Sequence, residues 1–201
     1  MTPPAHTAGP VAADADANAD ANANADADAN VGPNVSDWVD AGGGLSLRLE
    51  LPAGPYHAGD RLTARLHFRN DGPAPMRLYI VGGEAFRAQQ SDFQLSAADG
   101  RVLDRQPDPH PHGYVVTEAD FPEVAPGATK LVEQTLDLSP GVLDGQAGAL
   151  RLRWSYRNGV TVWKGGLQTL DGPTRNLFGV KPIPGIWSGQ ATVERTLPLA
   201  P

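Results

Sequence analysis

The feature that most constrains the fold is an unbroken alternation of apolar and polar residues over positions 150–157. Every second residue there is apolar, ending with Trp154 and Tyr156, and the residues between them are arginine or serine. Period two predicts a β-strand with one face buried and the other in water. Asn158-Gly159 follows, the dipeptide most typical of a type I′ turn. The sequence therefore predicts a hairpin that returns over residues 160–163, with Trp154 in the core.

Similar alternation, interrupted by turn signals, recurs along the chain after position 44. Further strands are predicted over 45–51, 61–69, 76–81, 93–95, 102–103, 114–117, 130–138 and 187–199. The segment between the fourth and fifth of these contains Ala98-Asp99-Gly100, a hairpin signal. About eight or nine short strands with almost no helical periodicity predict an all-β protein folded as an antiparallel β-sandwich.

Composition divides the chain into an N-terminal tail and a domain. Residues 11–30 alternate Ala with Asp or Asn after an initial Val-Ala, and the first 40 residues contain seven aspartates but no Lys or Arg. Alanine is too small to bury enough area for a sheet, and Asp and Asn disfavour strands. We therefore expect residues 1–44 to form a disordered, acidic tail and linker that ends at Gly42-Gly43-Gly44. Residues 45–201 are expected to form the β-sandwich domain.

The charge balance and the absence of cysteine exclude several classes of protein. Seven of the 23 acids lie in the tail, so the other 16 balance the 16 Lys and Arg residues and the domain is formally neutral. An electrostatic footprint for nucleic acid needs a clustered basic excess, so no nucleic-acid partner is expected. Without cysteine there is no disulfide scaffold and no thiol nucleophile. No apolar run approaches the roughly 20 residues of a membrane helix, so no membrane span is expected.

Short turn motifs punctuate the predicted strands in a recurring order. They are Gly59-Asp60, Asn70-Asp71-Gly72, Ala98-Asp99-Gly100, Pro126-Gly127 and Trp187-Ser188-Gly189. This order resembles that of bacterial immunoglobulin-like β-sandwich domains over roughly residues 45–199. It is also similar in layout to the bacterial intracellular proteinase-inhibitor family. The resemblance implies an Ig-like antiparallel β-sandwich of about 7–9 strands, but turn chemistry implies little about activity.

The stretch most suggestive of metal chemistry is Asp108-Pro109-His110-Pro111-His112-Gly113. His110 and His112 lie in a proline-stiffened loop that can present two imidazoles, which are ligands for copper or zinc. His57 or His67 would have to complete the site, because no third ligand stands at a diagnostic spacing. The sequence therefore predicts no cofactor, with copper or zinc at His110 and His112 as the alternative.

Aromatic residues at strand ends or in loops suggest a partner-binding surface, because flat exposed rings suit protein hot spots and carbohydrate stacking. The candidates are Tyr114, Trp163 and Trp187. A core position stays open for Trp163 and Trp187, since a buried tryptophan is normal in an Ig-like sandwich.

Catalytic motifs are absent or incomplete. The chain has no Gly-x-Ser-x-Gly nucleophile elbow and no phosphate-cradling glycine loop. Glu118 and Asp120, or Glu123, could act as an acid–base pair, but solvated loop acids are far more common. No catalytic residue is predicted.

The sequence leaves three functional hypotheses. The first is a non-enzymatic extracytoplasmic domain that binds another protein, such as a protease or an envelope component, through the loops 104–113 and 164–186. The second is a proteinase inhibitor acting by loop insertion, and the third is a copper-binding protein using the His-x-His loop. A periplasmic or secreted location is expected. A cytoplasmic one stays open because the N-terminus lacks the basic and apolar regions of a secretory signal. The residues do not predict the oligomeric state.

Overall fold

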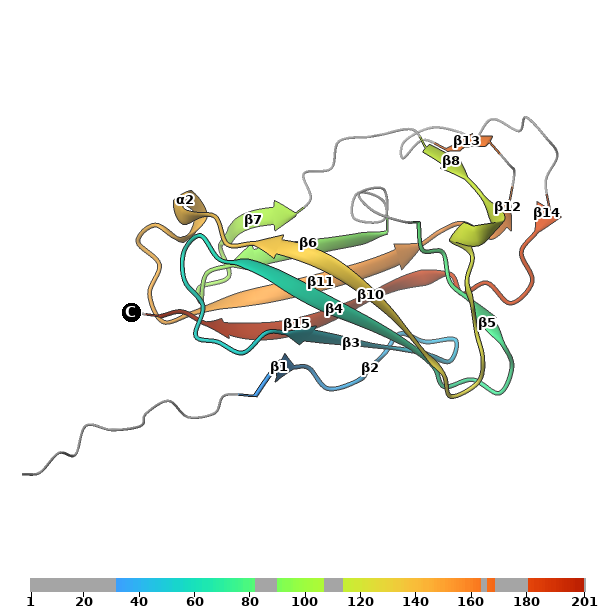
Figure 1. Ribbon diagram of the computed structural model, residues 1–201, viewed down its shortest axis with the longest axis horizontal. Helices are drawn as coiled ribbons and strands as arrows, with labels where there is room; N and C mark the ends of the chain where they lie inside the picture. Colours follow the sequence, from blue (N-terminus) through green and yellow to red (C-terminus); the bar gives the residue numbers. More distant parts are fainter. Residues whose placement is uncertain (1–31, 82–89, 107–113, 164–165, 169–180, 201) are drawn as a thin grey trace, which may run out of the picture. The chain divides into compact units, whose positions relative to one another are not determined.

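Two antiparallel sheets face each other and enclose one hydrophobic core (Figure 1). The computed structural model describes residues 32–81, 90–106, 114–163, 166–168 and 181–200. Contacts divide the chain into two units, residues 1–30 and 31–201, and every described residue belongs to the second. The prediction of an all-β antiparallel fold is confirmed.

Sheet 1 is built on three long strands, β3 (Leu45–Leu51), β4 (Arg61–Asn70) and β10 (Thr129–Asp137), in that spatial order. Two short strands, β1 (Asn34–Val35) and β2 (Val39–Asp40), both pair with the free side of β3. Sheet 2 has the order β15 (Gly189–Pro198), β11 (Ala149–Asn158), β6 (Ser91–Ser96) and β7 (Val102–Gln106).

Three strand pairs and two helical turns complete the described elements. The pairs are β5 (Met76–Arg77) with β9 (Glu123–Val124), β8 (Tyr114–Val116) with β13 (Gly166–Gln168), and β12 (Val162–Trp163) with β14 (Lys181–Pro182). The helical turns are η1 (Glu118–Asp120), a 3-10 helix, and α2 (Pro140–Leu143).

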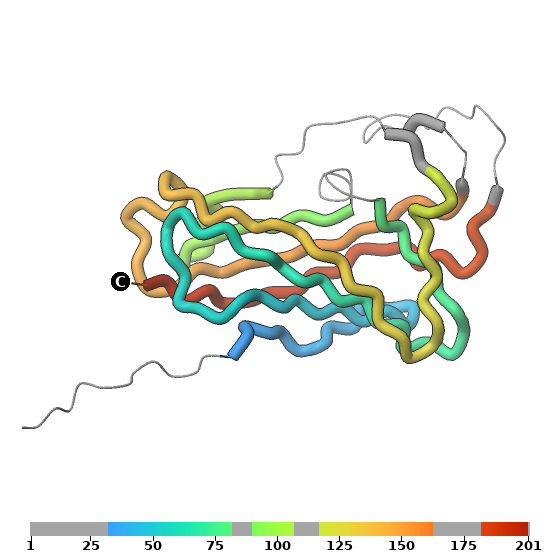
Figure 2. Tube along the Cα trace, viewed as in Figure 1, coloured from blue at the N-terminus to red at the C-terminus, as the bar shows by residue number. Residues whose placement is uncertain are grey.

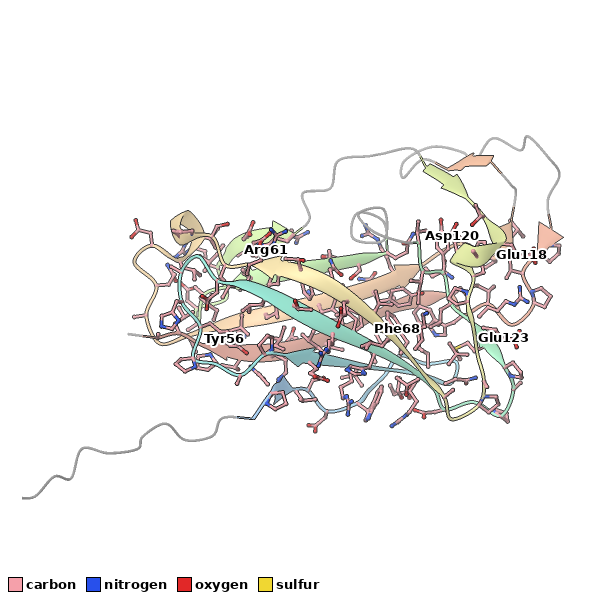
Figure 3. All side chains as sticks on the ribbon, in the orientation of Figure 1. Tyr56, Arg61, Phe68, Glu118, Asp120 and Glu123 are labelled. Atoms are coloured by element: carbon pink, nitrogen blue, oxygen red, sulfur yellow. The ribbon has the colours of Figure 1, made fainter. Side chains whose placement is uncertain are left out.

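An aromatic cluster joins the two sheets across the core. Phe68 of β4 (Figure 3) meets Trp154 of β11 edge to face, with the ring centroids 5.6 Å apart, and Tyr156 in the same manner at 4.8 Å. Trp187 then stacks on Tyr156 at 5.3 Å. Trp154 is fully buried, as the period-two pattern predicts. Its indole N–H donates to Ser91 Oγ (2.8 Å), so the only polar atom of the side chain is satisfied.

Side-chain hydrogen bonds bridge the sheets along both edges. On one side, the Arg195 guanidinium of β15 donates to Asn34 Oδ1 of β1, and Asn34 Nδ2 donates to the Thr196 carbonyl. On the other side, the Gln106 amide of β7 exchanges two hydrogen bonds with the backbone of Asp137 in β10. Each bridge satisfies strand-edge groups that would otherwise face solvent.

The predicted hairpin over 150–163 is wrong, although its first strand is correct. β11 is a central strand that pairs with β6 on one side and β15 on the other, so residues 160–163 cannot also pair with it. Instead, β12 pairs with β14. Asn158 faces inward at 4% exposure, and Gly159 does not adopt a positive φ. The Asn158 Oδ1 accepts a hydrogen bond from the Val160 N–H (2.7 Å), forming a local side-chain turn.

The predicted start of the domain at residue 45 is about ten residues too late. Residues 34–40, assigned to the linker, form β1 and β2, which appear in blue beside sheet 1 in Figure 2. Ser36 is buried and its hydroxyl accepts from the Leu49 N–H (2.9 Å). Gly42-Gly43-Gly44 is a tight turn into β3 with positive φ at all three residues. A Cβ on Gly44 would lie 3.0 Å from the Gly72 backbone, which explains why glycine is needed there.

Other strand predictions hold with shifted limits. The hairpin through Ala98-Asp99-Gly100 is confirmed: it joins β6 to β7, and Gly100 has φ 89°. The predicted strand at 76–81 is reduced to β5, but Leu78 and Ile80 still donate backbone hydrogen bonds to residues 122 and 120. The expected excursion over 164–186 lies partly outside the described residues, and its described part includes β13 and β14.

We predict that Asn158→Ala lowers the free energy of unfolding by about 2–3 kcal/mol, because Nδ2 donates to the buried Trp187 carbonyl and that acceptor would lose its partner. Urea unfolding followed by tryptophan fluorescence measures the change. Gln190→Ala, at an exposed position of β15, is the matched control and should have little effect. Equal stability of the two variants would contradict the structural role of Asn158.

Candidate functional site

The outer face of sheet 2 carries a group of exposed arginines. Because side chains alternate across a strand, Arg151, Arg153 and Arg157 of β11 all point away from the core, as does Arg105 of β7. We call this surface, made by these four residues, the arginine face. The period-two pattern of β11 was visible in the sequence, but the contribution of Arg105 came only from the pairing of β6 with β7.

The strand register fixes the layout of these residues. Gln94 of β6 lies between Arg153 and Arg105, because it pairs with both. Two residues on one strand are separated by about 6.6–6.8 Å and neighbouring strands by about 4.8 Å. Arg151 and Arg153 are therefore about 7 Å apart at their Cα atoms, and Arg153 and Arg105 about 10 Å. The face is a shallow array of cations at regular spacing.

Among the residues that the structure describes, Arg105, Arg151 and Arg153 form no ion pair with a carboxylate. Glu194 lies opposite Arg153 in the register, yet the Arg153 guanidinium donates to Thr192 Oγ1 at 3.4 Å. The face therefore holds four arginines against two acids, Asp92 and Glu194.

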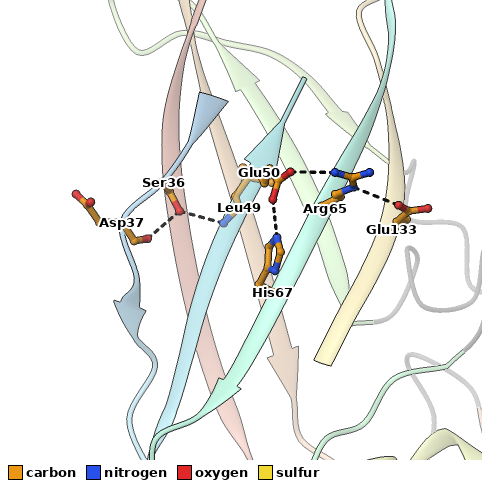
Figure 4. Close-up of polar contacts among 7 residues, drawn as sticks. All are labelled: Ser36, Asp37, Leu49, Glu50, Arg65, His67 and Glu133. Atoms are coloured by element: carbon orange, nitrogen blue, oxygen red, sulfur yellow. Dashed lines mark hydrogen bonds and ion pairs between the residues drawn. The ribbon is translucent and has the colours of Figure 1, made fainter. Parts of the chain in front are cut away.

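The outer face of sheet 1 provides the contrast. Arg65 pairs with Glu50 (3.0 Å) and Glu133 (3.3 Å), and Glu50 also contacts His67 Nε2 at 3.0 Å (Figure 4). Although burial opposes it, hydrogen bonds from Arg65 and His67 lower the pKa of Glu50. Two further pairs on this face are Arg61–Asp137 and Arg69–Asp71. Arg61, Arg65 and Arg69 of sheet 1 thus have carboxylate partners, whereas Arg105, Arg151 and Arg153 of sheet 2 have none among the described residues.

Asp92 is the acid that lies among the arginines of sheet 2. Burial raises its pKa, while the charges of Arg157, Arg105 and Arg153 act in the opposite direction and only partly compensate. Since the desolvation cost exceeds the Coulombic gain, Asp92 is a poor internal counter-ion for the arginine face.

Arg48 and Trp38 form a second surface cluster, on sheet 1. The guanidinium carbon of Arg48 lies 4.7 Å from the centre of the Trp38 ring, and that of Arg69 lies 4.1 Å from it. Trp38 is therefore half-buried under two cations rather than a free stacking surface. It anchors the segment between β1 and β2 to sheet 1, an interaction that the sequence did not suggest.

The structure describes some of the predicted site residues in full, some by their backbone alone, and others not at all. His110 and His112 lie outside the described residues. Tyr114 and Trp163 are described only by their backbone, in β8 and β12, so their proposed role in partner binding stays a prediction. Trp187 is 5% exposed, and its indole N–H donates to the Gly42 carbonyl (2.9 Å). Of the two interpretations for Trp187, the core position is therefore the one observed. Within the described part of the chain, no group of three or more His, Asp or Glu side chains could hold a metal ion.

Two of the three acids Glu118, Asp120 and Glu123 (Figure 3) have structural partners, Asp120 and Glu123. Asp120 accepts hydrogen bonds from the N–H and hydroxyl of Thr117, which closes the turn of η1. Glu123 pairs with Arg77 at 3.6 Å, across the β5–β9 pair. These contacts explain Asp120 and Glu123 without a catalytic role.

An open depression of about 390 Å³ lies beside the loop 72–76. Its walls include Pro73, Pro75, Met76, Ile186 and Trp187, and no residue lining it is titratable. The depression can therefore accept an apolar group but offers no acid, base or nucleophile of the usual kinds beyond the hydroxyl of Ser188.

The described part of the chain is thus an all-β antiparallel sandwich with four arginines on the outer face of sheet 2. No protein-family model, no curated protein and no solved structure matches the chain. In the described portion, helices are too short and insufficiently apolar to cross a bilayer.

We predict that Asp92→Asn raises the free energy of unfolding at neutral pH, because it removes a carboxylate whose ionised form is disfavoured by burial. Burial holds the pKa of Asp92 in the folded protein above its value in the unfolded chain. The wild type therefore loses stability as the pH rises from the unfolded-state pKa through the folded-state pKa, and the variant does not. Urea midpoints between pH 3 and pH 7 measure this. A stability difference that grows as the pH falls would contradict the assignment.

Proposed function

We propose that the chain is a non-enzymatic, Ig-like domain that binds an anionic macromolecule through the arginine face. The observation that carries this proposal is the contrast between the two sheets: Arg61, Arg65 and Arg69 of sheet 1 have carboxylate partners, but Arg105, Arg151 and Arg153 have none among the described residues. Exposed guanidinium groups without a carboxylate partner are available for bidentate bonds to carboxylate or phosphate.

The strand order supports the Ig-like part of the proposal. The chain runs from β3 and β4 in sheet 1 to β6 and β7 in sheet 2, then back to β10, and finally to β11 and β15. Repeated crossing between two sheets, with strands distant in sequence as neighbours, is the Greek-key arrangement of such sandwiches. An extracytoplasmic location follows from the resemblance to bacterial Ig-like domains and belongs to the same proposal.

Two observations support a binding role rather than catalysis. The depression beside the loop 72–76 is lined without a titratable group. Of the three acids considered for catalysis, Asp120 and Glu123 have structural partners, and Glu118 lies on the same exposed turn as Asp120. The predicted recognition loops, 104–113 and 164–186, are only partly described and stay a prediction. No observation on the described residues favours the proteinase-inhibitor or copper-binding alternative.

We predict that Arg105→Gln/Arg151→Gln/Arg153→Gln weakens binding of the full chain to anionic polymers. Polyglutamate, heparin and single-stranded DNA are suitable probes, with fluorescence anisotropy at low and physiological salt as the measurement. Three exposed ion pairs at about 0.2–1 kcal/mol each correspond to a loss of affinity between about threefold and 100-fold. The affinity of the wild type should also fall as the salt concentration rises.

Arg61→Gln/Arg65→Gln/Arg69→Gln is the matched control, since it removes the same charge from sheet 1. Circular dichroism establishes that both variants are folded. Because the sheet 1 arginines are already paired, this control should keep most of the binding. No binding to any of the three polymers, or equal losses in both variants, would refute the proposed function.

A further inference from the structure

The arginine face differs from a general polyanion site in the spacing of its charges and in what surrounds them. Arg151 and Arg153 stand at alternate positions of one strand. An extended polypeptide laid along β11 would present alternate side chains toward the face with the same repeat, about 6.6–6.8 Å. Carboxylates at every second position of such a segment would each meet one guanidinium.

The composition of the face disfavours nucleic acid and carbohydrate. No aromatic side chain lies on the outer side of β15, β11, β6 or β7. Single-stranded nucleic acids are held largely by base stacking on aromatic rings, and sugars commonly stack on such rings as well. The face carries four arginines and two acids, and this small positive excess neutralises few phosphates.

Two acids limit the width of a suitable ligand. Asp92 of β6 and Glu194 of β15 lie on either side of β11, on the same outer surface. They repel a broad or highly charged polymer that spreads across the sheet, but leave the line of β11 open to a narrow one. The exposed Val102, 46% accessible at the margin near Ser96, adds a site for one apolar contact.

We infer that the arginine face binds a short, extended acidic segment of a protein partner, with carboxylates at alternate positions aligned along β11. This inference rests on the proposed function, because it names the ligand of the same surface. Arg151 and Arg153 would pair with successive carboxylates, and Arg105 would pair with a flanking one. Arginine suits this role because its planar fork bonds a carboxylate in two places.

The test compares two labelled peptides of identical composition with the full chain. One has aspartate at every second position, separated by alanine and serine, and the other has the same aspartates in one block. Fluorescence anisotropy should show tighter binding of the alternating peptide by at least about threefold, the scale of one additional exposed ion pair. The Asp-rich residues 14–28 belong to the chain in both measurements, so they affect the apparent affinities of the two peptides equally.

Single variants locate the contact. Arg151→Gln and Arg153→Gln should each reduce binding of the alternating peptide, whereas Arg61→Gln on sheet 1 should leave it unchanged. Asp92→Asn should increase affinity for both peptides, because it removes a repulsive charge. Equal affinities for the two peptides, or tighter binding of heparin or an oligonucleotide of matched charge, would overturn the inference and leave the proposed function standing. Failure of every anion to bind would overturn both.

Discussion

The aromatic contact between the two sheets is the interaction on which the rest of the structure depends. Phe68 projects from sheet 1 against Trp154 and Tyr156 of sheet 2, at centroid distances of 5.6 and 4.8 Å. Such pairs add about 0.5–1.5 kcal/mol each beyond the burial of their area. Because these rings occupy alternate positions on β4 and β11, their burial also determines which residues of those strands face water. The arginine face is a direct consequence of that constraint.

The same alternation has different electrostatic results on the two sheets. In sheet 1, Glu50 and Glu133 come from the strands on either side of Arg65, so the register itself supplies its counter-charges. In sheet 2, the neighbours of Arg153 are Gln94 and Glu194, and only one of them is charged. A protein with a neutral domain composition can therefore present one locally cationic surface. The two outer faces therefore differ in how their arginines are paired.

Sequence reasoning predicted the all-β antiparallel fold, the hairpin at Gly100 and the burial of Trp154, because each depends on local periodicity or on one turn. It failed at Asn158-Gly159, where a local turn preference was overridden: both edges of β11 were already occupied by β6 and β15. It also failed at Gly42-Gly43-Gly44. A glycine run is typical of a linker, and the sequence does not show the close approach of Gly44 to Gly72 that makes this run a tight turn. The edge bridges through Asn34 and Gln106 had no signal in the sequence.

The sequence by itself determined which side chains share a face of each strand, since that follows from the two-residue repeat of an extended chain. It therefore placed Arg151 and Arg153 together on the wet side of one strand. Only the tertiary structure decided which strands became neighbours, and thus whether each arginine met an acid. Pairing partners here lie as far as 76 residues apart, as for Arg61 and Asp137, and local periodicity carries no information over that distance.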